Sequence, residues 1–323
     1  MLFRSFGLFP EEAAGDAIGL EAAKHTLECS EEADIYRHLG MSWVPPEMRE
    51  DMGEIEAASE SGSGLPALIE PSDIKGALHN HTVASDGTAS LEEMAAAAMD
   101  LGWEFLGIAD HSEVLNIGGR QIGVSAADVA GQAESIRALN EGWRDAGTDF
   151  RLLHGSECDI MVDGSLDYPE EVRNSLSHVV GSVHALGSWR ARDEIANTEA
   201  LITAVEDPTL TVLGHPTGRI LQGREGFPVD MHAVLRRMGE LNAEGELKAV
   251  EINASPYRLD LDWRLCKYAK ELGAPACINP DAHDTGGLRD CWFGVQVARK
   301  GWLSPADVLN TRSGAEMERL LGL

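Results

Sequence analysis

From residue 76 onward, short apolar runs alternate along the chain with longer stretches in which apolar positions repeat at helical spacing. Such short runs are typical of buried strands, and their alternation with helices is typical of parallel βα units. One helix has a clear start signal, because Ser90 and Glu93 form a capping box ahead of an alanine-rich run. Seven strands are predicted, over residues 76–81, 105–111, 150–160, 178–184, 210–215, 248–252 and 275–278.

Seven strands separated by helices favour one α/β fold, a TIM-like barrel that is distorted or short of eight strands, over two small domains. The region before this barrel has a different character. It contains the Pro45-Pro46 break and ends in Ser61-Gly62-Ser63-Gly64-Leu65-Pro66, a flexible sequence. We therefore predict a small, mainly helical N-terminal appendage at residues 1–60, a linker at 61–74 and the barrel at 75–323.

The composition, with 43% hydrophobic and 25% charged residues, is that of a soluble globular protein. It argues against a disordered, collagen-like or membrane protein. No apolar run is long enough to span a membrane, and the N-terminus lacks a signal-peptide pattern, so we expect a cytoplasmic protein. Five cysteines without a Cys-x-x-Cys spacing argue against a disulfide framework or a thiolate metal site.

The charge is unusual, because 54 acidic and 26 basic residues give a net charge of −28. Such a field repels polyanions, so a nucleic-acid substrate would have to be held by local arginines or by metal ions. A uniformly acidic surface can also reflect a salty cytoplasm. The sequence leaves both explanations open.

Histidine and carboxylate residues gather at the ends of the predicted strands. In a parallel barrel the C-terminal ends of all strands point to one rim, so residues far apart in the chain converge there. Residues two apart on a strand share a face. His79 and His81 could therefore both bind one metal cluster, and so could Asp281 and His283. Asp86 follows in a turn just after the first strand. The other residues of this kind are Asp110, His111, Glu157, Asp159, His184 and His215.

Imidazole and carboxylate groups without thiolates are a ligand set for Zn²⁺, Mn²⁺ or Fe²⁺, and their number here is too high for one ion. We therefore predict a site for two or three divalent ions. Each histidine alone could be an ordinary strand-end residue, but their joint placement favours a shared site. The predicted ligands are His79, His81, Asp86, His111, Glu157, His184, His215, Asp281 and His283. The other histidines are expected to be structural or surface residues: His25, His38, His154, His178 and His232.

These motifs, in this order, resemble those of the PHP family, named for polymerase and histidinol phosphatase. The likeness covers residues 75–323 and rests on His79-Asn80-His81, Ser85-Asp86-Gly87, Ala109-Asp110-His111-Ser112, Gly155-Ser156-Glu157, Ser182-Val183-His184, Gly214-His215-Pro216 and Asp281-Ala282-His283. More narrowly, three segments resemble the PHP domain at the C-terminus of bacterial family X DNA polymerases (PolX): 163–169, 214–219 and 251–261.

The resemblance implies a distorted (βα)₇ barrel with a trinuclear metal centre. By position, it assigns His79, His81, Glu157 and Asp281 to the first ion, bridging Glu157 with His184 and His215 to the second, and Asp86, His111 and His283 to the third.

The N-terminal segment extends this likeness, since residues 32–41 and 43–50 resemble the end of the PolX polymerase thumb. The fingers, the palm carboxylates and the helix-hairpin-helix modules of that family have no counterpart in this sequence. We therefore expect no nucleotide addition by this chain. A separate polypeptide could supply a polymerase or DNA-binding part.

The hypothesis that follows is hydrolysis of a phosphoester by a metal-bridging hydroxide. Glu157 would bridge the ions, Asp281 would be a ligand and a proton acceptor, and Asp110 would orient a metal-bound imidazole. Asp110 could equally cap a strand end. Arg219 and Arg258, in the loops after the fifth and sixth strands, could hold a phosphate, and ordinary salt bridges are an open alternative for both.

The PolX-like motifs favour a DNA 3′ end as the substrate, with 3′ to 5′ exonuclease or end-processing activity. The negative charge and the missing DNA-binding modules weaken this reading. The alternative is a small-molecule phosphate monoesterase that acts on histidinol phosphate or a nucleotide. A PHP domain that binds metal or a partner without catalysis is a third reading, although decay normally removes ligands first and all nine positions keep a coordinating residue.

Overall fold

The computed structural model describes residues 2–4, 7–9, 26–59, 61–62, 64–117 and 120–323. The chain divides into two compact units, Met1–Ala67 and Leu68–Leu323. Residues 68–74 belong to the second unit, because Ile69 is fully buried and its backbone N–H donates to the carbonyl of Leu303. Residues 68–74 are therefore part of the barrel unit, whereas the predicted linker extends to residue 74.

The first unit is organised around Arg49. This side chain donates to both carboxylate oxygens of Glu32, at 2.6 and 2.7 Å, and to the backbone carbonyl of Val44. Hydrogen bonds from Arg49 and Trp43 stabilise the charged form of Glu32 and lower its pKa to about 2. The elements of this unit are the hairpin of β1 (Leu2–Arg4) and β2 (Gly7–Phe9), α2 (Glu32–His38), the 3₁₀ turn η2 (Pro46–Met48) and α3 (Glu54–Ala58).

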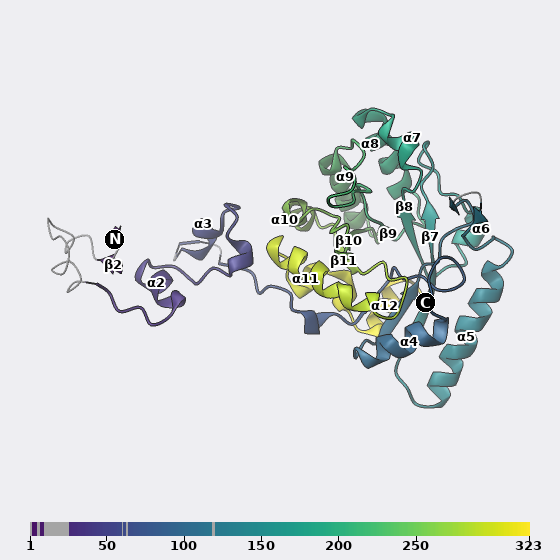
Figure 1. Ribbon diagram of the computed structural model, residues 1–323, viewed down its shortest axis with the longest axis horizontal. Helices are drawn as coiled ribbons and strands as arrows, with labels where there is room; N and C mark the ends of the chain where they lie inside the picture. The colour runs from purple at the N-terminus through teal and green to yellow at the C-terminus, as the bar shows by residue number, and fades with distance from the viewer. Residues whose placement is uncertain (1, 5–6, 10–25, 60, 63, 118–119) are drawn as a thin grey trace. The chain divides into compact units, whose positions relative to one another are not determined.

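The second unit is a sheet of seven parallel strands that curves into a nearly closed barrel with helices on its outer side (Figure 1). The strand order is β11-β10-β9-β8-β7-β4-β3, so strands that follow one another in the chain also lie side by side. This confirms the predicted seven-stranded, TIM-like α/β barrel. The strands are β3 (Gly76–Ala77), β4 (Phe105–Ile108), β7 (Arg151–Asp159), β8 (His178–Ser182), β9 (Val212–Leu213), β10 (Ala249–Asn253) and β11 (Ala276–Asn279).

Helices return the chain from the end of one strand to the start of the next. The first of them, α4 (Leu91–Asp100), begins as its sequence predicts, with reciprocal hydrogen bonds between Ser90 and Glu93. Within the described ranges, no helix is both long and apolar enough to cross a membrane. The other elements are the hairpin of β5 (Asn116–Ile117) and β6 (Arg120–Gln121), α5 (Val129–Asp145), α6 (Glu170–Arg173), α7 (Leu186–Arg190), α8 (Glu194–Val205), α9 (Met231–Ala243), α10 (Trp263–Glu271), α11 (Cys291–Lys300) and α12 (Gly314–Leu320).

Side-chain amides close the seam between β3 and β11, the strands at the two ends of the order. Asn310 donates to a backbone carbonyl of each strand, at 2.7 and 2.6 Å, and Asn279 accepts from the N–H of Leu78 at 2.8 Å. Just beyond the strands, the N–H of His81 donates to the carbonyl of Ala282 at 2.8 Å. The seam thus lies beneath the segments that carry the first and the last predicted ligands.

The regular strands β3, β4, β8 and β9 end earlier than predicted, since their predicted ranges run on to the predicted ligands. Isolated bridges continue the pairing at Asn80 and His111. The chain leaves the regular ladder there and turns over the mouth of the barrel. The predicted ligand His215, after β9, has φ 20°, and the predicted ligand Asp281, after β11, has φ 53°. Such conformations are uncommon away from glycine and cluster at functional sites.

The imidazole of His178 fills the space left by two glycines inside the barrel. Its Nε2–H donates to the carbonyl of Leu78 at 2.7 Å, and its Nδ1 accepts from the hydroxyl of Ser177 at 2.9 Å. Burial lowers the pKa of His178 to about 4, so the ring is neutral. An added β-carbon would lie 2.4 Å from this ring at Gly155 and 2.9 Å from it at Gly107. His178 is therefore a structural residue, in agreement with the sequence-based expectation.

Replacing Gly155 by alanine should destabilise the barrel by about 1–3 kcal/mol, because the new methyl group collides with the His178 ring in a packed interior. The free energy of unfolding in urea, measured on the full chain, tests this. Gly131→Ala on α5 is the matched control, since nothing lies within 4 Å of its added carbon and alanine is the better helix former. Equal losses for the two substitutions would contradict the packing role of His178.

Candidate metal centre

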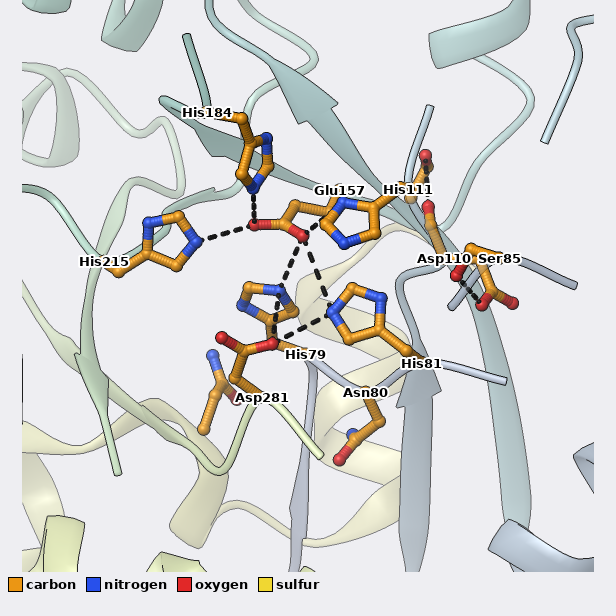
Figure 2. A network of polar contacts seen from close by, with 12 residues as sticks. His79, Asn80, His81, Ser85, Asp110, His111, Glu157, His184, His215 and Asp281 are labelled. Carbon is orange, nitrogen blue, oxygen red and sulfur yellow. Dashed lines mark hydrogen bonds and ion pairs between the residues drawn. The ribbon is translucent and has the colours of Figure 1, made fainter. Parts of the chain in front are cut away.

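A buried carboxylate, that of Glu157 on β7, lies at the mouth of the barrel among the imidazoles (Figure 2). Its Oε2 lies 3.2 Å from Nε2 of His79, 3.5 Å from Nε2 of His81 and 2.9 Å from Nδ1 of His111. These three rings come from the segments after β3 and β4. One side of the Glu157 carboxylate therefore faces the ligands of the first two strands.

The other oxygen of Glu157 faces a second set of rings. Its Oε1 lies 3.2 Å from Nε2 of His184, after β8, and 2.9 Å from Nε2 of His215, after β9. A carboxylate whose two oxygens point at two different sets of imidazoles has the geometry needed to bridge two ions. Glu157 can thus serve as the bridge that the sequence predicts.

Two more carboxylates complete the cluster. Oδ1 of Asp281 lies 3.0 Å from Nε2 of His81. Oδ2 of Asp86 lies 3.4 Å from Nε2 of His111 and 3.2 Å from Nε2 of His283. All nine predicted ligands therefore come together at one mouth of the barrel.

Three overlapping sets of these residues have ligand atoms within 4.8 Å of one another. His81 and His111 each belong to two sets, because their two ring nitrogens face different carboxylates. The assignment of these two histidines to one ion or another therefore stays a prediction. The sets are His81, Asp86, His111 and His283; His79, His81 and Glu157; and His111, Glu157 and His184.

Acceptors behind the rings fix three of the imidazoles. Nδ1 of His79 lies 2.7 Å from Oε1 of Glu251, and Nδ1 of His184 lies 3.1 Å from Oδ1 of Asp159. Nδ1 of His283 lies 2.9 Å from a backbone carbonyl. When Nδ1–H donates to such an acceptor, Nε2 keeps its lone pair directed at the centre, as in metal-bound histidine.

Glu251, on β10, is fully buried and holds two predicted ligands at once. Besides His79, its Oε1 accepts from the side-chain amide of Asn279 at 3.0 Å. Its Oε2 accepts from the backbone N–H of His215 at 2.6 Å and from the amide of Asn253 at 3.1 Å. The sequence pattern predicts no role for Glu251. The available signal was a carboxylate inside a buried apolar strand, which needs several hydrogen-bond donors.

Several buried atoms of the cluster have no hydrogen-bond partner among the described residues. Buried polar atoms without partners cost free energy, so a group of them beside carboxylates fits bound cations. Imidazole and carboxylate are also the ligands that Zn²⁺, Mn²⁺ and Fe²⁺ accept. The residues present therefore fit divalent ions. The atoms concerned are Nε2 of His79, Nδ1 of His81, His111 and His215, and Oε2 of Glu157.

The carboxylates and imidazoles shift one another's pKa. Burial disfavours charge on His79, His111 and His184, but Glu157 and the other carboxylates outweigh it and raise their pKa values, to about 10 for His111 and about 9 for His184. The same imidazoles outweigh burial at Glu157 and hold its pKa well below the usual range. Without ions, His79, His111 and His184 therefore carry protons at neutral pH. Burial instead lowers the pKa of His81 and His215.

Asp110 has a different role from the one predicted. Its Oδ1 accepts from the backbone N–H of Thr82 at 2.7 Å and from the hydroxyl of Ser85 at 2.6 Å. Its Oδ2 accepts from the hydroxyl of Thr82 and the amide of Gln132, both at 2.7 Å. Its hydrogen-bond partners in the described chain include no imidazole, because the donors of the adjacent loop occupy both oxygens. This corrects the prediction: Asp110 positions the loop that carries Asp86 (Figure 2).

The two predicted phosphate-binding arginines differ. Arg219 donates to the backbone carbonyls of Arg258 and Leu259 and forms an ion pair of 2.8 Å with Asp262. All three nitrogens of its guanidinium have partners within the protein. This corrects the prediction for Arg219, which stabilises the loop after β10 and does not bind phosphate. Arg258 is directed at the cluster. Its Nε lies 3.6 Å from Oδ2 of Asp281, and its buried Nη1 has no hydrogen-bond partner among the described residues.

The histidines that were expected to lie outside the site do so where the structure describes them. Nε2 of His154 lies 3.2 Å from Oε1 of Gln132, and burial lowers the pKa of His154 to about 4. His38 is partly exposed on α2, and His232 is exposed on α9. His25 lies outside the described residues.

Comparison with known proteins decides the family. The PHP domain matches residues 77–255, more than half of the chain. The chain belongs to the PHP family. The DNA polymerase beta thumb matches residues 1–50. The DNA polymerase/3′-5′ exonuclease PolX of Bacillus subtilis is 37% identical over 290 residues, which are 90% of this chain and 48% of that protein. The chain thus spans about half the length of this PHP relative.

Phosphatases are also similar to this PHP chain. A probable phosphatase of Thermoanaerobacter sp. is 27% identical over 253 residues, which are 75% of this chain and 92% of that protein. A solved structure from Listeria monocytogenes, described as a histidinol phosphatase, has a TM-score of 0.50 at 16% identity and covers 66% of this chain and 97% of that one. This structural likeness supports the fold alone. By its family, the chain is a metal-dependent phosphoester hydrolase.

Glu251→Gln should lower the affinity for divalent metal by about 10–100-fold. The two carboxylate oxygens now accept from Nδ1–H of His79 and from the backbone N–H of His215, and an amide has only one oxygen to accept these bonds. Competition with a fluorescent chelator measures this affinity. Glu246→Gln is the control, since Glu246 is an exposed residue that pairs with Lys248 just before the same strand. Equal affinities for the two variants would contradict the positioning role of Glu251.

Binding of metal at pH 7 should release protons, because His111 and His184 are protonated in the ion-free protein and only neutral imidazole binds a metal. Because the raised pKa values are about 9 and 10, the apparent affinity for metal should rise with pH up to that range and should fall as the pH is lowered. Adding Mn²⁺ to ion-free protein in weak buffer with a pH indicator measures the release. Saturation without a change in pH would contradict these proton positions.

Proposed function

We propose that this chain hydrolyses phosphodiester bonds at the 3′ end of DNA, as a PolX-type 3′ to 5′ exonuclease or end-processing enzyme. The observation that carries this proposal is the extent of the match to the Bacillus subtilis PolX, which covers 90% of the chain. The thumb match lies in the first unit and the PHP match in the second. A polymerase-thumb sequence joined to a phosphoesterase barrel is expected at a DNA end more than on a free metabolite.

Two or three divalent ions, Zn²⁺, Mn²⁺ or Fe²⁺, would be held by the cluster at the mouth. Such ions lower the pKa of a water molecule towards neutrality and neutralise charge on phosphoryl oxygens. The residues behind the ligands keep the rings in place and set which nitrogen binds. The first ion would be held by His79, His81, Glu157 and Asp281, the second by Glu157, His184 and His215, and the third by Asp86, His111 and His283.

Asp281 and Arg258 are the side chains best placed to act on the substrate. The imidazoles of His79 and His81 outweigh burial and hold the pKa of Asp281 well below its usual range. Asp281 therefore stays ionised, as both metal binding and proton acceptance at Oδ2 require. The unpartnered Nη1 of Arg258, beside that oxygen, can donate to a non-bridging oxygen of the scissile phosphate.

The second candidate is a phosphate monoesterase that acts on a small molecule. The observation in its favour is the match to the Thermoanaerobacter phosphatase, which extends over 92% of that protein. The net charge of −28 points the same way, because it opposes the approach of DNA. In this case the cluster and Arg258 would keep the same roles on a terminal phosphate.

Protein loaded with Mn²⁺ should shorten 5′-labelled single-stranded DNA stepwise from its 3′ end and act slowly on a panel of phosphate monoesters. The variant with both His79→Ala and Asp281→Ala should lose more than about 100-fold in rate after metal reconstitution, since two ligands are gone. His232→Ala, on the exposed face of α9, is the control and should keep full rate. Circular dichroism checks that each variant is folded.

Salt separates the two candidate substrates. The KM for DNA should rise steeply between about 50 and 200 mM salt, whereas that for a monoester should change modestly. Hydrolysis of monoesters with every DNA end left intact would overturn the DNA proposal. Full activity of the double variant would overturn the role of the metal centre.

A further inference from the structure

Three arginines lie on consecutive loops at the mouth of the barrel. Arg190 ends α7, after β8; Arg224 lies in the loop after β9; and Arg258 lies in the loop after β10. Because β8, β9 and β10 are neighbours in the sheet and their C-terminal ends share one rim, these loops are neighbours too. We call Arg190, Arg224 and Arg258 the arginine triplet.

Direct contacts join the second and third of these loops. The N–H of Leu221 donates to the carbonyl of Tyr257 at 2.7 Å, and Arg219 donates to the carbonyl of Arg258 at 3.1 Å. The Arg258 side chain then runs towards Asp281, with its Nη1 buried and without a hydrogen-bond partner in the described chain. One member of the triplet therefore lies beside the metal centre itself.

Arg224 is held in place by its backbone. It exchanges two hydrogen bonds of 2.9 Å with Ile220, and its Nε donates to the carbonyl of Gly218 at 3.1 Å. No carboxylate of the described residues lies within 4.0 Å of the guanidinium of Arg224 or Arg190. Burial and, after it, the positive charges of Arg258 and Arg190 lower the pKa of Arg224, in keeping with the adjacency of the three loops.

This arrangement is unfavourable without an anion. In a chain with 54 acidic residues, arginines can usually find a carboxylate. Of these three, only Arg258, with Asp281, has one within 4.0 Å among the described residues. Arg224 and Arg258 are half-buried, and Arg190 is exposed. Like charges held together cost free energy, more where they are partly buried, and a bound anion recovers this cost. Guanidinium groups are well suited to phosphate, because their planar fork matches two oxygens.

We propose that Arg224 and Arg190 form a second phosphate subsite, which binds the phosphate next to the scissile one. This inference rests on the proposed function, in which the ions and Arg258 take the scissile phosphate. A small monoester has a single phosphate, so it leaves the second subsite empty. A polynucleotide has a further phosphate one nucleotide away. The subsite therefore selects a sugar-phosphate backbone and gives an acidic protein one local region that attracts it.

Binding of two small probes tests the subsite, with phosphate release followed in parallel so that only intact probe is counted. Calorimetric titration of the Mn²⁺-loaded protein should give a lower Kd for thymidine 3′,5′-bisphosphate than for thymidine 5′-monophosphate, by about tenfold. Arg224→Ala should bring the ratio of the two Kd values close to one, and Arg224→Lys should restore part of it. A wild-type ratio of one, or the same ratio in wild type and Arg224→Ala, would overturn the subsite.

The control is Arg144→Ala. Arg144 lies in the last turn of α5, is exposed, and belongs to the opposite end of the barrel, because α5 returns the chain to the start of β7. This variant changes the net charge by the same amount as Arg224→Ala and should keep the wild-type ratio. A loss of the ratio in Arg144→Ala as well would assign the effect to overall charge and overturn the subsite.

Hydrolysis separates this inference from the proposed function. On single-stranded DNA, Arg224→Ala should raise KM about tenfold and reduce the slope of log affinity against log salt by about 0.7. DNA hydrolysis that is identical in wild type and Arg224→Ala would leave the proposed function standing and remove the subsite. The wild-type protein could instead prefer the bisphosphate, lose this preference in Arg224→Ala and fail to hydrolyse DNA. This result would contradict DNA as the substrate and would keep the subsite for another ester with two phosphates.

Discussion

The burial of the Glu157 carboxylate among imidazoles is the constraint on which the rest of the structure depends. Polar groups at this density are tolerated inside a protein only when opposite charge lies between them, as bound cations or as protons on the rings. The barrel satisfies this demand by bringing groups from several strands together at one rim. Glu251 and Asp159 then fix the rings from behind. The chemistry of the mouth and the packing of the strands are therefore two aspects of one arrangement.

Much of this arrangement can be predicted from the sequence, because strand ends of a parallel barrel share a rim whatever the loops do. The sequence does not show which hydrogen-bond partner each side chain binds. Asp110 binds donors of the adjacent loop, and Arg219 binds carbonyls of the loop that carries Arg258, although both had been expected at the reacting groups. Glu251 looks like one acid in an apolar strand. These choices depend on distances between segments that are remote in the chain.

The overall charge and the local charge of the molecule have opposite signs. The surface as a whole repels anions, whereas the mouth combines sites for cations with the arginine triplet. Repulsion at long range is screened within about 8–10 Å at ordinary salt, so contacts at the mouth decide whether an anionic ester binds. Binding free energy is thereby concentrated at the reacting groups, where orientation of the ester matters most.

The amide-closed seam has a consequence for the cofactor. His79 and His81 follow the first strand and Asp281 follows the last, so these predicted ligands lie on opposite sides of the seam. An ion shared between them would act as a cross-link at the place where Asn279 and Asn310 replace a backbone ladder. The ring of strands would then be completed by the inorganic ion, which makes metal occupancy part of the architecture of the barrel as well as of its reactivity.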